Sequence, residues 1–173
     1  SRLFVAKAKT LENEPLAAHA QVQVVINRFS HFTKARGIDV QNEVAGDIKT
    51  PPLPITAYSG VVMNLYTNAI KAVVAVRESV AAPKVTFRGW NERGKHIIEV
   101  LDNGAGIPRE VRNRIWDPLY TTTSDVENPL GSGMGLGLTL VKQMVSELNG
   151  SVEIRDDIPA GYSTCFRVTL PLK

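Results

Sequence analysis

Two glycine-rich clusters are the stretches of this sequence best suited to chemistry. The first, at residues 102–108, reads Asp-Asn-Gly-Ala-Gly-Ile-Pro and directly follows an apolar, strand-like run. The second, at residues 131–138, has glycine at every second position up to Gly137 and opens a helical pattern. Glycine lets the backbone approach a ligand closely and turn its N–H groups toward an anion. Ordinary turns explain either cluster alone equally well, but the two together predict a nucleotide-binding site.

Asp102 carries the chemistry of the first cluster. An ionised carboxylate at the end of a strand only accepts hydrogen bonds, so it selects a ligand that presents an N–H donor. Adenine presents its exocyclic amine where guanine presents a carbonyl, so an aspartate here can choose adenine. Gly104 and Gly106 leave room for a flat base. The helix that begins after the second cluster offers free N–H groups to phosphate oxygens.

A polar stripe on an apolar helix adds a second set of candidates. Asn64, Asn68 and Lys71 recur at i, i+4 and i+7, which places them on one narrow face. Asparagine is a mediocre helix former, so the stripe is either a solvated face or a face turned toward a polar ligand. In the second case Asn68 would give one oxygen to Mg²⁺ and Lys71 would meet phosphate charge. Taken together, these groups suit Mg·ATP.

Commoner nucleotide sites are excluded by their missing motifs. The sequence has no G-x-x-x-x-G-K-[ST] run, so this is not a P-loop protein. The second glycine cluster does not fit the dinucleotide motif G-x-G-x-x-G, and protein-kinase signatures are absent.

The composition describes an ordinary globular domain. The length of 173 residues, with 43% hydrophobic content, fits one domain with a real core. A net charge of +3 with scattered basic residues argues against a nucleic-acid partner. No apolar run approaches the roughly 20 residues that span a bilayer, so this chain itself is expected to make no membrane contact. The single Cys165 excludes an internal disulfide and is expected to be a buried thiol, which favours a cytoplasmic location.

Periodicity and punctuation place these candidates on a set of helices and strands. Helices are expected at 15–36, 56–79, 108–116 and 136–148, and strands at 38–44, 84–90, 95–101, 151–155 and 162–170. Loops are expected at 46–54 and 117–132. The order predicts an α/β sandwich, with one mixed, mostly antiparallel sheet covered by three helices on one face.

With these motifs the sequence resembles the ATP-binding catalytic domain of bacterial sensor histidine kinases, in the GHKL superfamily with the gyrase B subunit and the MutL proteins. Four motifs occur in the family's order over about residues 15–171. They are the N box at 64–71, the G1 box at 102–108, the F box at 116–122 and the G2 box at 131–138. The resemblance implies a Bergerat fold, a single domain over 1–173 and a mobile ATP lid at about 107–133.

The resemblance also implies roles for individual residues. Asp102 would hold the adenine amine directly and through water, Asn68 would bind Mg²⁺, and Lys71 would approach the phosphates. Thr164 resembles a threonine that supports the base pocket. The other positions expected to contact nucleotide are Asn64, Gly104, Gly106, Ile107, Tyr120, Thr121, Thr122, Gly133, Met134, Gly135, Leu136 and Gly137.

One position separates subfamilies. The ATP-hydrolysing members have a glutamate as general base four residues before the magnesium asparagine, whereas Asn64 stands there in this chain. An amide does not take up a proton usefully near neutral pH. Asn64 and Lys71 are therefore assigned to phosphoryl transfer, in which catalysis is mainly positioning and charge neutralisation.

The sequence departs from the family pattern in its F box and in the absence of a phosphoacceptor box. The F box has Leu119 in place of the frequent phenylalanine and lacks the lysine that can follow its threonines. His19, His31 and His96 all lack the context of a phosphoacceptor box, so each is expected to be structural or solvent-exposed. The dimerisation helices and the phosphoacceptor are expected outside this chain, in a parent protein that could be membrane-anchored.

The expected partners are ATP or ADP, a phosphoacceptor histidine domain and a response regulator. Two alternatives remain open: a GHKL-type ATPase driven by lid closure, and a binding module that uses nucleotide as a regulatory ligand.

Overall fold

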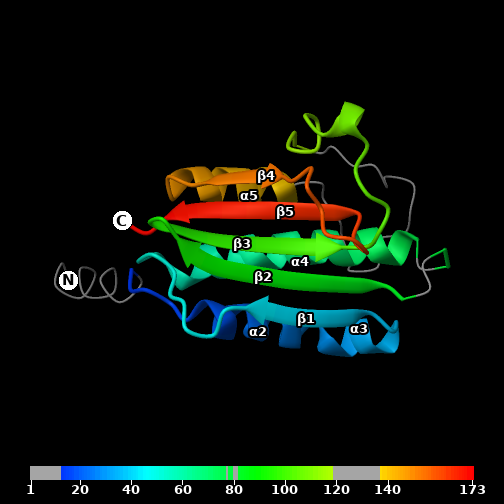
Figure 1. Ribbon diagram of the computed structural model, residues 1–173, viewed down its shortest axis with the longest axis horizontal. Coiled ribbons are helices and arrows are strands. Elements are labelled where there is room, and N and C mark those ends of the chain that lie inside the picture. The colour runs from blue at the N-terminus through cyan, green and yellow to red at the C-terminus, as the bar shows by residue number, and fades with distance from the viewer. Residues whose placement is uncertain (1–12, 77, 80–81, 119–136) are drawn as a thin grey trace.

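The protein folds into a five-stranded sheet covered by helices on one face (Figure 1). The structure is a computed structural model, and it describes residues 13–76, 78–79, 82–118 and 137–173. The strands are β1 (Asp39–Val44), β2 (Lys84–Glu92), β3 (Lys95–Asp102), β4 (Ser151–Ile154) and β5 (Thr164–Pro171). The helical elements are α2 (Ala18–Arg28), α3 (Ser30–Ala35), α4 (Ile55–Ala75), the single 3₁₀ turn η1 (Arg109–Val111) and α5 (Gly137–Glu147). The predicted α/β sandwich is confirmed.

The sheet is mixed and mostly antiparallel, as predicted. Its strand order is β1-β2-β3-β5-β4, and only the β1–β2 pair among these is parallel. A parallel pair needs a long crossover, and α4 supplies it between β1 and β2. The β2–β3 hairpin closes through Arg93 and Gly94, which have φ of 49° and 74°. Two consecutive left-handed residues match the twist of the flanking strands.

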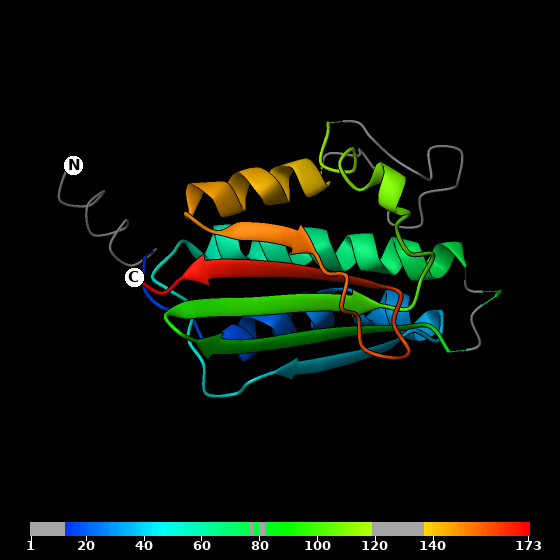
Figure 2. The same ribbon diagram turned by 45° about the horizontal axis from the view of Figure 1, so that its top comes forward.

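The core lies between the sheet and α4. Strand residues with period 2, such as Phe87, Val100 and Phe166, face the helices, and α4 contributes Leu65 and Tyr66 from its buried side. The α4 helix runs between α5 and α2 behind the sheet (Figure 2) and packs against both, so the stripe of α4 that they leave uncovered is only partly exposed. This arrangement fixes the position of any polar side chain on that stripe.

The expected helix at 15–36 is wrong in two respects. Its start is extended, because Leu16 and Thr50 exchange hydrogen bonds and Ala17 forms a bridge with Lys49. The helix is also interrupted at Phe29, whose ring packs edge-on against Tyr66 with centroids 5.8 Å apart. No helix-breaking residue in the sequence marks either feature, since both arise from tertiary contacts.

Two other predicted helices are too long. The helix expected at 56–79 ends at Ala75, and Ser79 then closes a turn by donating to the carbonyl of Val76. The helix expected at 108–116 is reduced to η1, followed by turns that donate from Arg114 and Ile115 to Val111. The helix expected at 136–148 is confirmed as α5.

The face of the sheet that none of the described helices covers carries a row of charges. Glu99 on β3 lies between Arg88 on β2 and Arg167 on β5, and both arginines pair with its carboxylate. The Glu99 side chain is buried beneath them. Cys165 is buried on the same face, which confirms the expected buried thiol.

At the hairpin end of the sheet, His96 joins three segments. Its Nε2 lies 2.8 Å from the hydroxyl of Tyr58 on α4, and its Nδ1 lies 2.7 Å from Oδ1 of Asn91. Asn91 in turn donates to the carbonyl of Lys49. Burial lowers the pKa of His96 to about 4, so its imidazole is neutral at physiological pH.

Within the described part of the chain, none of the helices has both the length and the apolar character that crossing a membrane requires.

Candidate nucleotide-binding site

Asp102 ends β3 as a buried carboxylate on the helix-covered side of the sheet. It is 1% exposed and pairs across the sheet with the buried Thr164 at the start of β5. Its Oδ1 accepts a hydrogen bond from the N–H of Gly104 at 2.9 Å. Burial raises the pKa of Asp102 to about 7, although the Gly104 hydrogen bond opposes this rise. A carboxylate offers about four acceptor sites, so a ligand donor can still be accommodated.

The loop that follows Asp102 lies directly against α4. A Cβ atom at Gly104 would lie 2.5 Å from the carbonyl of Ala72, and the N–H of Ala105 donates to that carbonyl oxygen at 3.3 Å. Gly106 has φ of 76°, which a side chain would strain. The glycines are therefore required by the close approach to α4 and by a left-handed turn.

Asn103 ties the start of this loop to the first residue of β2 and to the chain just before it. Its Oδ1 accepts from the N–H of Lys84 and its Nδ2 donates to the carbonyl of Ala82, each at 2.8 Å. The loop is thus fixed at its first residue.

The polar stripe on α4 is partly buried. Asn64, Asn68 and Lys71 all have intermediate exposure, so the stripe is neither core nor freely solvated. Burial lowers the pKa of Lys71, which marks a cation in a site short of compensating charge.

The N-terminus of α5 meets this stripe at Asn64. A Cβ atom at Gly137 would lie 3.1 Å from Oδ1 of Asn64, while Nδ2 of Asn64 donates to the carbonyl of Gly60 at 2.7 Å. Gly60 is also packed against Met144, so glycines on both helices allow the close approach. The free N–H groups at the start of α5 therefore lie beside the stripe.

The structure brings most of the described candidates together along α4. Asp102, Gly104, Gly106 and Thr164 gather where Ala72 contacts the loop. Asn64 and Gly137 meet two turns earlier on the same helix, with Asn68 and Lys71 between the two groups.

Ile107 lies at the edge of this group, partly buried against the core, and its carbonyl accepts from Nε of Arg112. The remaining candidates and most of the predicted lid at 107–133 lie outside the described residues; these candidates are Tyr120, Thr121, Thr122, Gly133, Met134, Gly135 and Leu136.

Two residues beside the candidate site, Ser163 and Trp116, were given no site role from the sequence, although Trp116 stands in the F box. Ser163 donates from its hydroxyl to the carbonyl of Gly104 at 2.7 Å. Trp116 packs edge-on against Phe166, and its carbonyl accepts from the hydroxyl of Thr139 on α5. From the sequence, the contact made by Ser163 could have been suspected only because this residue directly precedes Thr164, an expected site residue.

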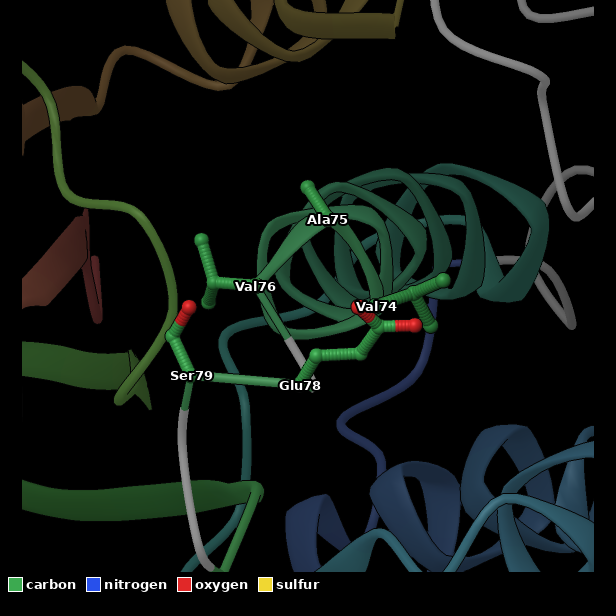
Figure 3. Close-up of a pocket in the computed structure, with 5 residues that line it drawn as sticks. All are labelled: Val74, Ala75, Val76, Glu78 and Ser79. Carbon is green, nitrogen blue, oxygen red and sulfur yellow. The ribbon is translucent and has the colours of Figure 1, made fainter.

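A hollow of about 310 Å³ lies at the C-terminal end of α4 (Figure 3). It is lined by Val74, Ala75, Val76, Glu78 and Ser79. Among the described lining residues Glu78 is the one ionisable group, so they offer no set of converging polar groups and we assign the hollow no role.

The described residues fit a magnesium ion that depends on the nucleotide for most of its ligands. They contain no group of three or more His, Cys, Asp or Glu side chains that could hold a metal. The amide oxygen of Asn68 is a hard donor at a partly buried position. Magnesium commonly takes one or two protein ligands and completes its shell with phosphates and water, so one asparagine is sufficient.

A family model described as "Histidine kinase-, DNA gyrase B-, and HSP90-like ATPase" matches residues 56–173. The nitrogen regulation protein NtrY of Azorhizobium caulinodans is 33% identical over 134 residues, covering 74% of this chain and 16% of NtrY. The sensor protein RprX of Bacteroides fragilis is 30% identical over 173 residues, covering 98% of this chain and 31% of RprX. The chain thus spans less than a third of the length of either relative.

The solved catalytic domain of histidine kinase ThkA superposes with a TM-score of 0.76 at 22% identity. The superposition covers 92% of this chain and 95% of that domain, which establishes the shared fold. The residues that the family model matches, 56–173, include the polar stripe of α4, the loop after Asp102 and the start of α5. The chain therefore belongs to the histidine kinase-, DNA gyrase B- and HSP90-like ATPase family, as an ATP-binding catalytic domain of the type found in sensor kinases.

Proposed function

We propose that this domain binds Mg·ATP and transfers the γ-phosphoryl group to a histidine on a separate segment or partner, in two-component signalling. The observation that carries the proposal is the state of Asp102. It is a buried carboxylate that receives one backbone hydrogen bond, beside a loop of glycines packed on α4. An adenine amine would supply the missing donor and favour the ionised form.

The phosphates would extend from the adenine pocket along α4 toward α5. Lys71 has a partly buried ammonium group whose pKa is lowered by burial, and phosphate charge would compensate it. Asn68 would hold Mg²⁺, which when bound neutralises charge on the phosphate oxygens. The N–H groups at the start of α5 would add hydrogen bonds to the same oxygens.

Asn64 favours phosphoryl transfer over hydrolysis. Its amide is committed to the Gly60 carbonyl and stands beside Gly137, and it has no basicity with which to activate water. Catalysis would then consist of orienting the γ-phosphoryl group toward an imported nucleophile and stabilising its charge.

The environments of the three histidines support an acceptor outside this domain. Both ring nitrogens of His96 have hydrogen-bond partners in the interior. Nδ1 of His19 lies 2.8 Å from the carbonyl oxygen of Val44, and His31 is exposed on α3 without a phosphoacceptor motif. A separate phosphoacceptor domain and a response regulator would complete the pathway, in the cytoplasm.

The first test is calorimetric titration of this chain with ATP and ADP, with and without Mg²⁺, followed by phosphate release from the same sample. We expect magnesium-dependent ATP binding and negligible release. Brisk release would favour the ATPase alternative, and tight ADP binding without transfer to a supplied phosphoacceptor domain would favour a regulatory binding module.

Two matched pairs of variants test the phosphate side. Asn64→Glu should raise phosphate release because it installs a general base, whereas Asn64→Gln, which has the shape of the glutamate variant without its basicity, should not. Asn68→Ala should abolish the magnesium dependence of ATP binding, whereas Asn68→Asp keeps an oxygen ligand. An unaltered magnesium dependence in Asn68→Ala would remove Asn68 from the metal site.

A further inference from the structure

The connection between β4 and β5 (residues 155–163) lies against the loop that follows Asp102. Figure 2 shows it crossing the end of β3 from which this loop departs. Ser163, its last residue, donates from its N–H to the carbonyl of Asp102 at 2.8 Å. This bond extends the β3–β5 ladder by one residue and places the Ser163 side chain over the loop.

The hydroxyl of Ser163 holds the loop itself. Its Oγ lies 2.7 Å from the carbonyl oxygen of Gly104 and 3.3 Å from that of Asp102. A Cβ atom at Gly106 would lie 3.8 Å from Ser163, within ordinary contact distance. Ser163 therefore holds the loop at its beginning and middle and lies close to Gly106 near its end.

The opposite side of the same loop is fixed by α4. The N–H of Ala105 donates to Ala72, and Gly104 fits against the Ala72 backbone with no space for a side chain. The loop is thus held between one helix and one side chain. Removing the helix contact would require rebuilding α4, but removing the other contact requires only the loss of one hydroxyl.

The same connection makes a second contact, at its other end. Oδ1 of Asp156 lies 2.5 Å from Nη1 of Arg112 and 3.6 Å from Nη2 of Arg109. Nε of Arg112 donates to the carbonyl of Ile107, the residue directly after the glycine loop. Asp156 is 64% exposed, so this ion pair is screened by solvent and is the weaker of the two contacts.

We propose that the β4–β5 connection is a positioning element for the adenine half of the nucleotide, with Ser163 as its main residue and Asp156 as a weaker second tether. This inference rests on the proposed ATP-binding function. Ser163 touches no reacting atom in this arrangement; it acts by holding the Gly104 carbonyl and the Asp102 backbone where the base must fit. A loop ordered before binding avoids the entropic cost of ordering it on binding.

The main test compares Ser163→Ala with Ser163→Thr, which keeps the hydroxyl. Ser163→Ala should weaken adenosine, ADP and ATP by the same factor, about three- to tenfold for one lost hydrogen bond. Equal losses are expected because the three ligands share the base and differ in their phosphates. Ser163→Thr should restore binding, and amide hydrogen exchange of Gly104, Ala105 and Gly106 should quicken in Ser163→Ala alone.

A matched control removes a hydroxyl from the far end of β5, the strand that Ser163 precedes. Thr169→Ala on β5, opposite Ile97, should leave all three affinities unchanged. The unfolding free energy of each variant, measured in urea, separates a loss of affinity from a loss of folded protein.

The outcomes separate this inference from the function on which it rests. If the native protein binds no adenine nucleotide, the proposed function and this inference both fail. If it binds ATP and Ser163→Ala binds adenosine equally well, or loses affinity for ATP alone, only this inference fails.

The weaker tether is tested by removing the charge of Asp156. Asp156→Asn should weaken adenosine binding by about twofold at low salt and not at all in about 0.5 M NaCl, because an exposed ion pair is screened. Asp156→Glu, which keeps the charge and leaves the hydrogen bond from Arg112 Nε to the Ile107 carbonyl in place, should retain the low-salt affinity. No effect of Asp156→Asn at low salt would remove Asp156 from the positioning element.

Discussion

Glu99 and Asp102 lie three residues apart on β3, and each is 1% exposed, yet the fold treats the two carboxylates in opposite ways. They lie on opposite faces of the sheet because strand side chains alternate. Burial opposes ionisation of Glu99, but hydrogen bonds from Arg88 and Arg167 outweigh it and hold its pKa below the usual value. Burial raises the pKa of Asp102 to about 7, against one N–H donor from Gly104.

The difference separates structural charge from binding charge. A buried carboxylate whose cations belong to the fold stabilises the fold, and no ligand is needed to complete it. A buried carboxylate that lacks such partners keeps an unfilled acceptor and a perturbed pKa, which is the usual condition of a functional group. This criterion supports the proposed place of Asp102 in the nucleotide site and gives Glu99 a structural role.

The largest effect should follow from removing the structural carboxylate. Glu99→Ala leaves Arg88 and Arg167 without their shared partner, and we expect a loss of about 3 kcal/mol in unfolding free energy. ATP affinity of the folded fraction should not change. Urea denaturation and calorimetry measure the two quantities.

The control for this variant is Glu153→Ala, which removes an exposed carboxylate from β4, in register with Arg167. Its cost should be about 0–1 kcal/mol, as for surface ion pairs. Equal costs for the two variants would contradict the structural assignment of Glu99.

The second effect is the converse. Asp102→Asn should leave unfolding free energy unchanged or higher, because it removes a buried acid without breaking an ion pair. ATP affinity should fall by about 10- to 100-fold, the range for losing a hydrogen bond to a charged group. Asp39→Asn, an exposed position on β1, is the matched control. An undiminished preference for ATP over GTP in Asp102→Asn would exclude the carboxylate from base recognition.

The sequence predicts one of these carboxylates and misses the other for a physical reason. Asp102 follows an apolar run and precedes two glycines, so its place at a strand end is a local property. The partners of Glu99 lie 11 and 68 residues away, and only the strand register brings them together. Local patterns carry no information about such pairs.

The same distinction explains the other successes and errors. The mixed sheet, the position of α5 and the Gly104 loop followed from local periodicity and turn residues. The interruption at Phe29 and the short η1 depend on packing against Tyr66 and on turns with no distinctive residues. The contact of Ser163 with Gly104 spans 59 residues and depends on the register of β5.

The third effect is a pH dependence that only the binding carboxylate should show. If adenine binds the ionised form of Asp102, as proposed, its affinity should rise as pH rises through about 7. Adenosine is the suitable probe because it carries no phosphate to titrate. Its affinity should increase about tenfold between pH 6 and pH 8, and the increase should vanish in Asp102→Asn. A flat profile in the native protein would show that binding does not require the carboxylate form.

The smallest effect concerns Cys165, on the same face as Glu99. Burial raises the pKa of its thiol to about 12, with the neighbouring Glu99 charge adding to the rise. We expect a thiol reagent to leave native Cys165 unlabelled over hours and to modify it on unfolding. Labelling should be faster in Glu99→Ala and unchanged in Asp102→Asn. Equal acceleration in both variants would mean that the two faces of β3 are not independent.

The neutral, buried His96 near the other end of β3 has a consequence for the whole strand. Between about pH 4 and pH 6.5 the unfolded chain carries a proton on this histidine that the folded protein excludes, so this end gains stability as pH rises. Over the same interval the folded protein retains on Asp102 a proton that the unfolded chain releases, so that end loses stability as pH rises.

The two proton imbalances are opposite in sign and nearly cancel, so these two groups leave the free domain indifferent to mild acidification. A bound adenine that keeps Asp102 ionised removes one of the two imbalances. The nucleotide complex should then lose up to about 1.4 kcal/mol of stability per pH unit on acidification through this interval, which the free domain would not. Nucleotide binding at Asp102, at one end of β3, thus determines whether the proton excluded from His96 near the other end affects the stability of the domain.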